Sequence, residues 1–120
     1  MATYSKLTLS GSTDGKGIKV VQTATPGTTV HTGTSTPADY DEIWLYAYNG
    51  HTAAVVLTIE LGGVAVPDDN IVVTIPNKAG LFLVVPGLVL KGNASPLVVK
   101  AFAAITNVVV ITGFVNRIVA

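Results

Sequence analysis

Short apolar runs separated by turn residues dominate this chain. The runs are rich in Val, Ile, Leu, Thr and aromatic residues, and none keeps a 3.6-residue apolar period for three helical turns. We therefore expect strands and no helix of any length. The predicted strands are 5–9, 18–22, 28–33, 42–48, 53–61, 71–75, 81–85, 88–91, 97–103 and 108–118.

Turn residues occur between these runs at regular intervals. Asn49-Gly50 lies between two strand-like runs and predicts a hairpin, because both residues tolerate positive φ. Gly62-Gly63, Pro86-Gly87 and the segment 92–96 predict further turns. Turns spaced this regularly favour an all-β fold, an antiparallel β-sandwich, jelly-roll-like or barrel-like single domain.

The first residues have a different composition. Residues 1–17 are rich in Ser, Thr, Gly and Lys, and the Gly11 to Gly17 segment follows one short alternating run. We predict an extended N-terminal arm over residues 1–17 and a β-sandwich domain over residues 18–120. Such an arm can add a strand to a neighbouring sheet edge through main-chain hydrogen bonds. The alternative is an ordinary first strand followed by a mobile loop.

The last predicted strand is apolar on both faces. In a two-layer domain of this size, one apolar face meets the core and the other needs cover from a loop, an edge or another subunit. Cover from within the chain and contact with a subunit are both open. Val109, Ile111 and Val115 lie on one face, and Val110, Phe114 and Ile118 lie on the other.

Three aromatic residues follow one another along the fourth predicted strand. Trp44, Tyr46 and Tyr48 are two residues apart, so their rings project from one face of a strand. An exposed row would form a protein contact patch or a platform for sugar rings, since aromatic side chains supply large rigid contact areas. In the alternative the row fills the core, and Ile43, Leu45 and Ala47 lie elsewhere.

Charge and composition exclude several classes of partner. The 120 residues have a formal net charge of +0, so they carry no electrostatic footprint for nucleic acid or an anionic membrane. Only 12% of residues are charged, against about 25% in ordinary domains. The apolar runs are far shorter than the ~20 residues of a spanning helix, and the first residues do not resemble a secretory signal. We expect a soluble protein made in a cytoplasm, with part of its surface covered by partners.

Candidate catalytic and metal-binding residues are few. His31 and His51 have no metal-ligand spacing, and the chain has 0 cysteines and no Gly-x-Ser-x-Gly sequence. We interpret both histidines as solvated loop residues, and we expect no enzyme activity, no metal and no cofactor. Two acidic groups could supply calcium ligands, but turn and strand-start roles are favoured. They are Asp39, Asp41 and Glu42, and Asp68, Asp69 and Asn70.

Three of these features together resemble the small head decoration (cement) proteins of tailed bacteriophages. They are the arm over residues 1–17, the segment 40–50 (YDEIWLYAYNG) and the apolar end 108–118. The resemblance lies in architecture and composition and spans most of the chain. It implies a β-rich domain, often trimeric, that binds the outside of an expanded phage head and holds neighbouring major capsid subunits together. The protein would then lie on the capsid exterior of the virion after synthesis in the host cytoplasm.

These expectations define a set of candidate partner-binding residues. Their partners would be the major capsid protein and other copies of the chain, with a trimer as the favoured oligomer. We expect no binding to nucleic acid or to a membrane. The competing interpretations are a carbohydrate-binding, lectin-like module and a tail or fibre protein of the same virion. The candidates are Tyr4, Leu7, Leu9, Trp44, Tyr46, Tyr48, Phe114 and Ile118.

Overall fold

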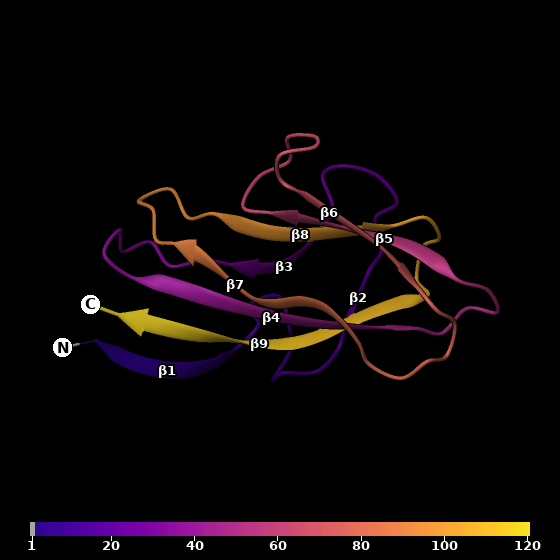
Figure 1. Ribbon diagram of the computed structural model, residues 1–120, viewed down its shortest axis with the longest axis horizontal. Coiled ribbons are helices and arrows are strands. Elements are labelled where there is room, and N and C mark those ends of the chain that lie inside the picture. Colours follow the sequence, from indigo (N-terminus) through magenta and orange to yellow (C-terminus); the bar gives the residue numbers. More distant parts are fainter. Residues whose placement is uncertain (1) are drawn as a thin grey trace.

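Two antiparallel β-sheets lie one above the other in the computed structural model, which describes residues 2–120 (Figure 1). These residues contain no helix, which confirms the predicted all-β class. The strands are β1 (Thr3–Thr8), β2 (Ile18–Lys19), β3 (Thr28–Thr32), β4 (Tyr40–Asn49), β5 (Val55–Leu61), β6 (Asn70–Ile75), β7 (Phe82–Lys91), β8 (Val98–Ala103) and β9 (Val109–Val119).

The strand order is that of a jelly roll. One sheet has the order β1-β9-β4-β7, with β2 also paired to β9, and the other has the order β3-β8-β5-β6. Within the described residues, β5 and β6 are the only consecutive strands that pair with each other. Most other connections cross from one sheet to the other, as in the double Greek key of jelly-roll domains. The sandwich prediction is therefore confirmed.

The hairpin predicted at Asn49-Gly50 is wrong, because β4 and β5 lie in different sheets. The Asn49 side chain is buried and donates hydrogen bonds to the carbonyl oxygens of Ala53 (3.0 Å) and Ile75 (2.9 Å). The Gly50 N–H donates to the Val108 carbonyl oxygen at 2.9 Å. These hydrogen bonds fix a turn that connects β4 of one sheet to β5 of the other, and it does not form a hairpin.

Pro86-Gly87 is not a turn, which is a second correction. β7 runs through both residues as one strand, with register shifts against β4 on either side of Trp44–Leu45. β7 is an edge strand, where a proline without an N–H and an irregular register are tolerated. Gly87 has φ 78, and a Cβ there would lie 2.8 Å from the Trp44 ring, so a glycine fits this irregular position.

The predicted N-terminal arm is not confirmed. Residues Thr3–Thr8 form the edge strand β1 of the chain's own sheet, paired with β9 from Thr3 opposite Val119 to Thr8 opposite Phe114. The following loop is held by internal hydrogen bonds, including Gly11 N–H to the Val30 carbonyl at 2.9 Å. The arm prediction used composition alone, whereas the alternation of β1 lets Leu7 reach the core side of the sheet.

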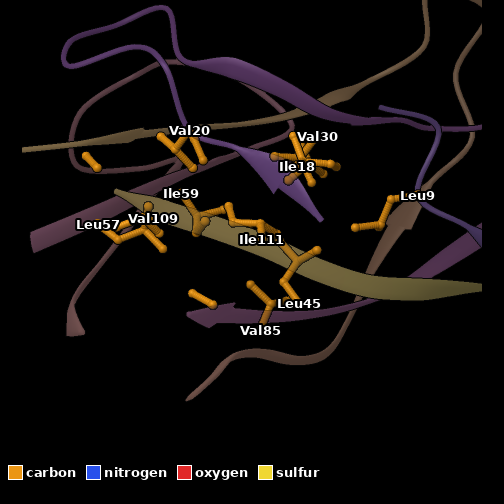
Figure 2. Close-up of a cluster of buried hydrophobic side chains, with 14 of the residues drawn as sticks. Leu9, Ile18, Val20, Val30, Leu45, Leu57, Ile59, Val85, Val109 and Ile111 are labelled. Carbon is orange, nitrogen blue, oxygen red and sulfur yellow. The ribbon is translucent and has the colours of Figure 1, made fainter. Parts of the chain in front are cut away.

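The core lies between the two sheets and is built mainly from alternate residues of each strand. On β4, Ile43, Leu45 and Ala47 are fully buried. Figure 2 shows Leu57 and Ile59 of β5 in the same cluster as Val109 and Ile111 of β9. One face of each sheet therefore fills the interior. The other buried apolar residues are Leu9, Ile18, Val20, Val30, Val55, Ile75, Val85, Val99, Ala101, Ala103 and Val115.

A prediction concerns the close approach of β9 to β4. A Cβ at Gly113 would lie 2.0 Å from the Trp44 carbonyl oxygen, whereas a Cβ at Gly50 would meet its nearest atom at 3.4 Å. Replacing Gly113 with Ala should lower the free energy of unfolding by about 1–3 kcal/mol through overpacking. Gly50→Ala is the matched control. Chemical denaturation measures both, and equal effects would contradict this account of the β4–β9 contact.

Candidate functional site

The outer face of the sheet β1-β9-β4-β7 carries most of the aromatic side chains of the chain. Residues directly opposite each other on antiparallel strands share a face, so the register builds this face row by row. Tyr4, Ile118 and Tyr40 form one row, and Phe114 and Trp44 form another. Tyr46 and Leu83 follow, and then Val110 and Tyr48. We call this surface the aromatic face.

The three aromatic residues of β4 point outward. Trp44 and Tyr46 are half-buried and Tyr48 is 37% exposed, while the alternating residues between them fill the core. The alternative in which the row fills the core is therefore wrong. Ile43, Leu45 and Ala47 occupy the interior because smaller aliphatic side chains pack between the two sheets there.

Two of the predicted partner-binding residues do not belong to this face. Leu9 is 1% exposed and belongs to the core, and Leu7 packs against the core from the inner side of β1. Both were selected because the N-terminal segment was expected to be an arm. The other six candidates, Tyr4, Trp44, Tyr46, Tyr48, Phe114 and Ile118, do lie together on the aromatic face.

The centre of the aromatic face is a fixed cluster of aromatic and polar side chains. The rings of Trp44 and Phe114 stack with centroids 6.0 Å apart, and Lys6 Nζ lies 4.8 Å from the Phe114 centroid. Glu42 accepts hydrogen bonds from Trp44 Nε1 at 2.6 Å and from Asn116 Nδ2 at 2.9 Å. The hydrogen bond from Trp44, and to a lesser extent the one from Asn116, holds the pKa of the Glu42 carboxyl below its usual value. Glu42, the acidic side chain that the described strands place on this face, is thus hydrogen-bonded to its neighbours.

Tyr40 and Lys91 extend the aromatic face but were not selected from the sequence. Tyr40 has the same parity as Trp44 on β4, and Lys91 Nζ lies 5.5 Å from the Tyr40 ring centroid. The sequence could have placed Tyr40 on this face, because Tyr40 lies four residues before Trp44 and residues an even number apart on a strand share a face. Lys91 could be placed beside it only from the pairing of β4 with β7.

The size of the aromatic face is close to that of a protein interface. Its four strands and the ten residues of β4 cover roughly 650 Å² at about 4.8 Å between strands and about 3.4 Å per residue. A standard interface buries about 800 Å² per partner. A sheet face of this extent that gathers most of the aromatic side chains is a candidate binding surface.

A second cluster lies between the sheets, where the sequence predicted none. His31 on β3 is 2% exposed, and its Nε2 lies 2.8 Å from the Asp41 carboxylate on β4. Arg117 of β9 donates to both oxygens of the same carboxylate, at 2.7 and 2.9 Å. The interpretation of His31 as a solvated loop residue is therefore wrong. The acidic partner is ten residues away in the chain, and only the crossing from one sheet to the other brings the two together.

Every side-chain nitrogen of His31 has a partner. Nδ1 accepts the Ser10 N–H at 3.1 Å, so the ring proton lies on Nε2 and is donated to Asp41. Burial alone would raise the pKa of Asp41, but the hydrogen bonds from Arg117 and His31 outweigh it and hold that pKa below its usual value. With both nitrogens engaged, His31 cross-links the sheets and is not placed to act as a general base.

A cleft of about 650 Å³ opens above this cluster, between the β1 and β3 edges. Six of its twelve lining residues carry hydroxyl groups, and Asp39 and Arg117 are its charged residues. Asp39 accepts the Ala120 N–H at 3.1 Å and Arg117 donates to Asp41, so both charged side chains already have partners. The lining residues are Leu7, Thr8, Ser10, His31, Thr32, Gly33, Thr34, Ser35, Thr36, Asp39, Pro96 and Arg117.

The acidic groups considered as calcium ligands do not form a site. Glu42 lies on the aromatic face, whereas Asp41 is in the interior. Asp69 accepts the Ala65 N–H at 3.0 Å, a turn role of the kind expected for it. Within residues 2–120, no three His, Asp or Glu side chains are grouped to hold a metal ion, and no helix could cross a membrane.

Comparisons with known proteins assign no function to this site. The chain matches no known protein family, and searches of curated proteins and of solved structures find no similar protein. The aromatic face is the candidate functional site, because its side chains are exposed or half-buried and accessible to a partner, while those of the buried cluster bind one another.

A prediction concerns the pH dependence of the buried cluster. The folded pKa of Asp41 lies below the unfolded value of about 3.9, so its stabilisation is present above about pH 4 and is lost as pH falls through the folded pKa. Asp41→Asn should lower the free energy of unfolding at pH 7 by about 2–3 kcal/mol, less than for a fully buried pair because Arg117 is partly exposed.

The measurement is urea denaturation of both proteins at pH 7 and pH 3. The difference between wild type and Asp41→Asn should shrink at pH 3, while Asp14→Asn, in the exposed loop after β1, should change little at either pH. A difference that is the same at both values would mean that the Asp41 charge does not stabilise the fold.

Proposed function

We propose that this chain is a non-enzymatic structural protein of a tailed-phage head, which binds neighbouring shell subunits through the aromatic face. The observation that carries the proposal is that face itself, an outward sheet surface of roughly 650 Å² built from Tyr4, Tyr40, Trp44, Tyr46 and Phe114. Aromatic residues are the side chains that protein interfaces favour most at their centres.

The fold is compatible with this role. Jelly rolls occur in viral capsid proteins and in lectin domains. That is an analogy of fold and does not by itself assign a function. The small number of charged residues supports the proposal further, since 12% of the chain is charged and the outer face of one sheet is mostly apolar. Attachment at many equivalent positions would stabilise an expanded shell by mass action.

A carbohydrate-binding module is the second candidate, because the Glu42 carboxylate and the Asn116 amide lie beside Trp44. The environment of the Trp44 ring argues against it. The ring stacks against Phe114 with centroids 6.0 Å apart, and a Cβ at Gly87 of β7 would lie 2.8 Å from it. A sugar ring needs a free aromatic face to stack on, and these neighbours crowd the Trp44 ring. The geometry thus favours a protein partner.

The abundance of the chain in virus particles tests the proposal. Quantitative mass spectrometry of purified particles should find it in numbers comparable to the major shell protein. A few copies per particle would place it in the tail or at a vertex, and its absence from particles would overturn the virion role.

A substitution in the aromatic face should abolish binding to the shell. Tyr46→Asp places a charge at the centre of the face, so its occupancy on heads lacking this chain should fall at least about tenfold. Val56→Asp, at an exposed position on β5 of the other sheet, is the control. Circular dichroism should show that both variants are folded. Equal occupancy of the two variants would show that the aromatic face does not bind the shell, and glycan binding lost with Trp44→Ala would favour the carbohydrate module.

A further inference from the structure

The aromatic face carries a positive rim although the whole chain has no net charge. Lys6, Lys91 and Lys19 lie on the outer side of β1, β7 and β2, the last opposite Val110 of β9. The acidic side chain of these strands on the same side is Glu42, whose hydrogen bonds come from uncharged donors, so three lysines stand against one carboxylate. A partner for this face therefore needs an apolar centre and an acidic group at its edge.

The loop between β5 and β6, residues 62–69, has this complementary chemistry. Val66 is 74% exposed and Val64 is 47% exposed, and Asp68 is exposed beside them. The loop projects from the sheet opposite the aromatic face, at the top of the view in Figure 1. Two exposed valines next to an acidic side chain at the tip of a hairpin form a small apolar knob with a negative edge.

Internal hydrogen bonds hold this loop in one shape. The Asp69 N–H donates to the Ala65 carbonyl at 2.9 Å, and the Ala65 N–H donates to the Asp69 carboxylate at 3.0 Å. The Leu61 N–H donates to the Asp69 carbonyl at 2.8 Å, where the hairpin closes. A loop ordered before binding loses little conformational entropy when it docks, which favours its use as a contact element.

We propose that the β5–β6 loop of one copy docks on the aromatic face of a second copy. Val64 and Val66 would pack on the aromatic side chains, and Asp68 would pair with the lysine rim. This inference rests on the proposed protein-binding role of the aromatic face, and it identifies the neighbouring shell subunits bound there as other copies of this chain. Because each copy has one loop and one face, the contact is head-to-tail and closes into a ring or continues as a chain of copies.

A symmetric contact between two aromatic faces fits the charges less well. It would place the lysines of one copy near those of the other, and the carboxylate of Glu42 already has its hydrogen-bond donors in its own chain. Like charges facing each other across an interface cost free energy. The loop of a second copy supplies the missing negative charge.

Charge reversal on purified protein tests the pairing. Sedimentation of the wild type should show self-association, which weakens as salt is added. Lys6→Glu with Lys91→Glu, and separately Asp68→Lys, should each weaken it about tenfold, and all three changes in one chain should restore it. The controls Lys6→Arg with Lys91→Arg, and Asp68→Glu, keep the charges and should associate like the wild type.

A mixing experiment tests the head-to-tail geometry. Val66→Asp disables the β5–β6 loop and keeps the aromatic face intact. Tyr46→Asp disables the aromatic face and keeps the loop intact. Each should be monomeric alone, and the mixture should form a dimer of one copy of each and no larger species. A wild type that stays monomeric up to about 1 mM, a missing rescue by the triple reversal, or a mixture without dimer would overturn the proposal.

Failure here is separate from failure of the proposed function. If the purified protein does not self-associate, while Tyr46→Asp still loses occupancy on phage heads, the aromatic face binds a shell protein and not a second copy. If self-association follows the predicted pattern and the chain is absent from particles, the loop-to-face contact is confirmed and the virion role is wrong.

Discussion

The structure depends on the alternation of buried and exposed residues along β4. Its inner side carries Asp41, Ile43, Leu45, Ala47 and Asn49, all fully buried. The three apolar residues in the middle fill the space between the sheets. The two polar residues at the ends hydrogen-bond across that space, Asp41 to His31 of β3 and Asn49 to the Ile75 carbonyl of β6. One strand thus supplies core packing and both polar links.

The polar links give the two sheets a defined relation. Apolar packing is non-directional and tolerates small shifts of one sheet over the other. A bidentate Arg117–Asp41 pair and a buried Asn49 amide have directional partners, and any shift would leave them unsatisfied at a cost. In a chain with 0 cysteines, these contacts and the core are what holds the sandwich together.

The same alternation produces the candidate site. Because the inner positions of β4 are taken by the core and its polar links, the positions between them must face outward, and Trp44, Tyr46 and Tyr48 occupy these. The neighbouring β9 contributes Phe114 and Ile118 in register. The centre of the aromatic face is therefore the outer side of the two central strands of the sheet, on a rigid support where side chains keep their positions when a partner binds.

The sequence by itself determined the class of the fold and the period of each strand, because alternation and turn residues act over a few neighbouring positions. It also identified most of the aromatic face, since Trp44, Tyr46, Tyr48, Phe114 and Ile118 were selected from strand parity. Which of the two faces was buried was decided by the tertiary structure. The partner of His31, the path of the chain after Asn49 and the place of β1 were decided there too. The physical reason is that these depend on pairing between strands far apart in the chain. No local pattern records that pairing.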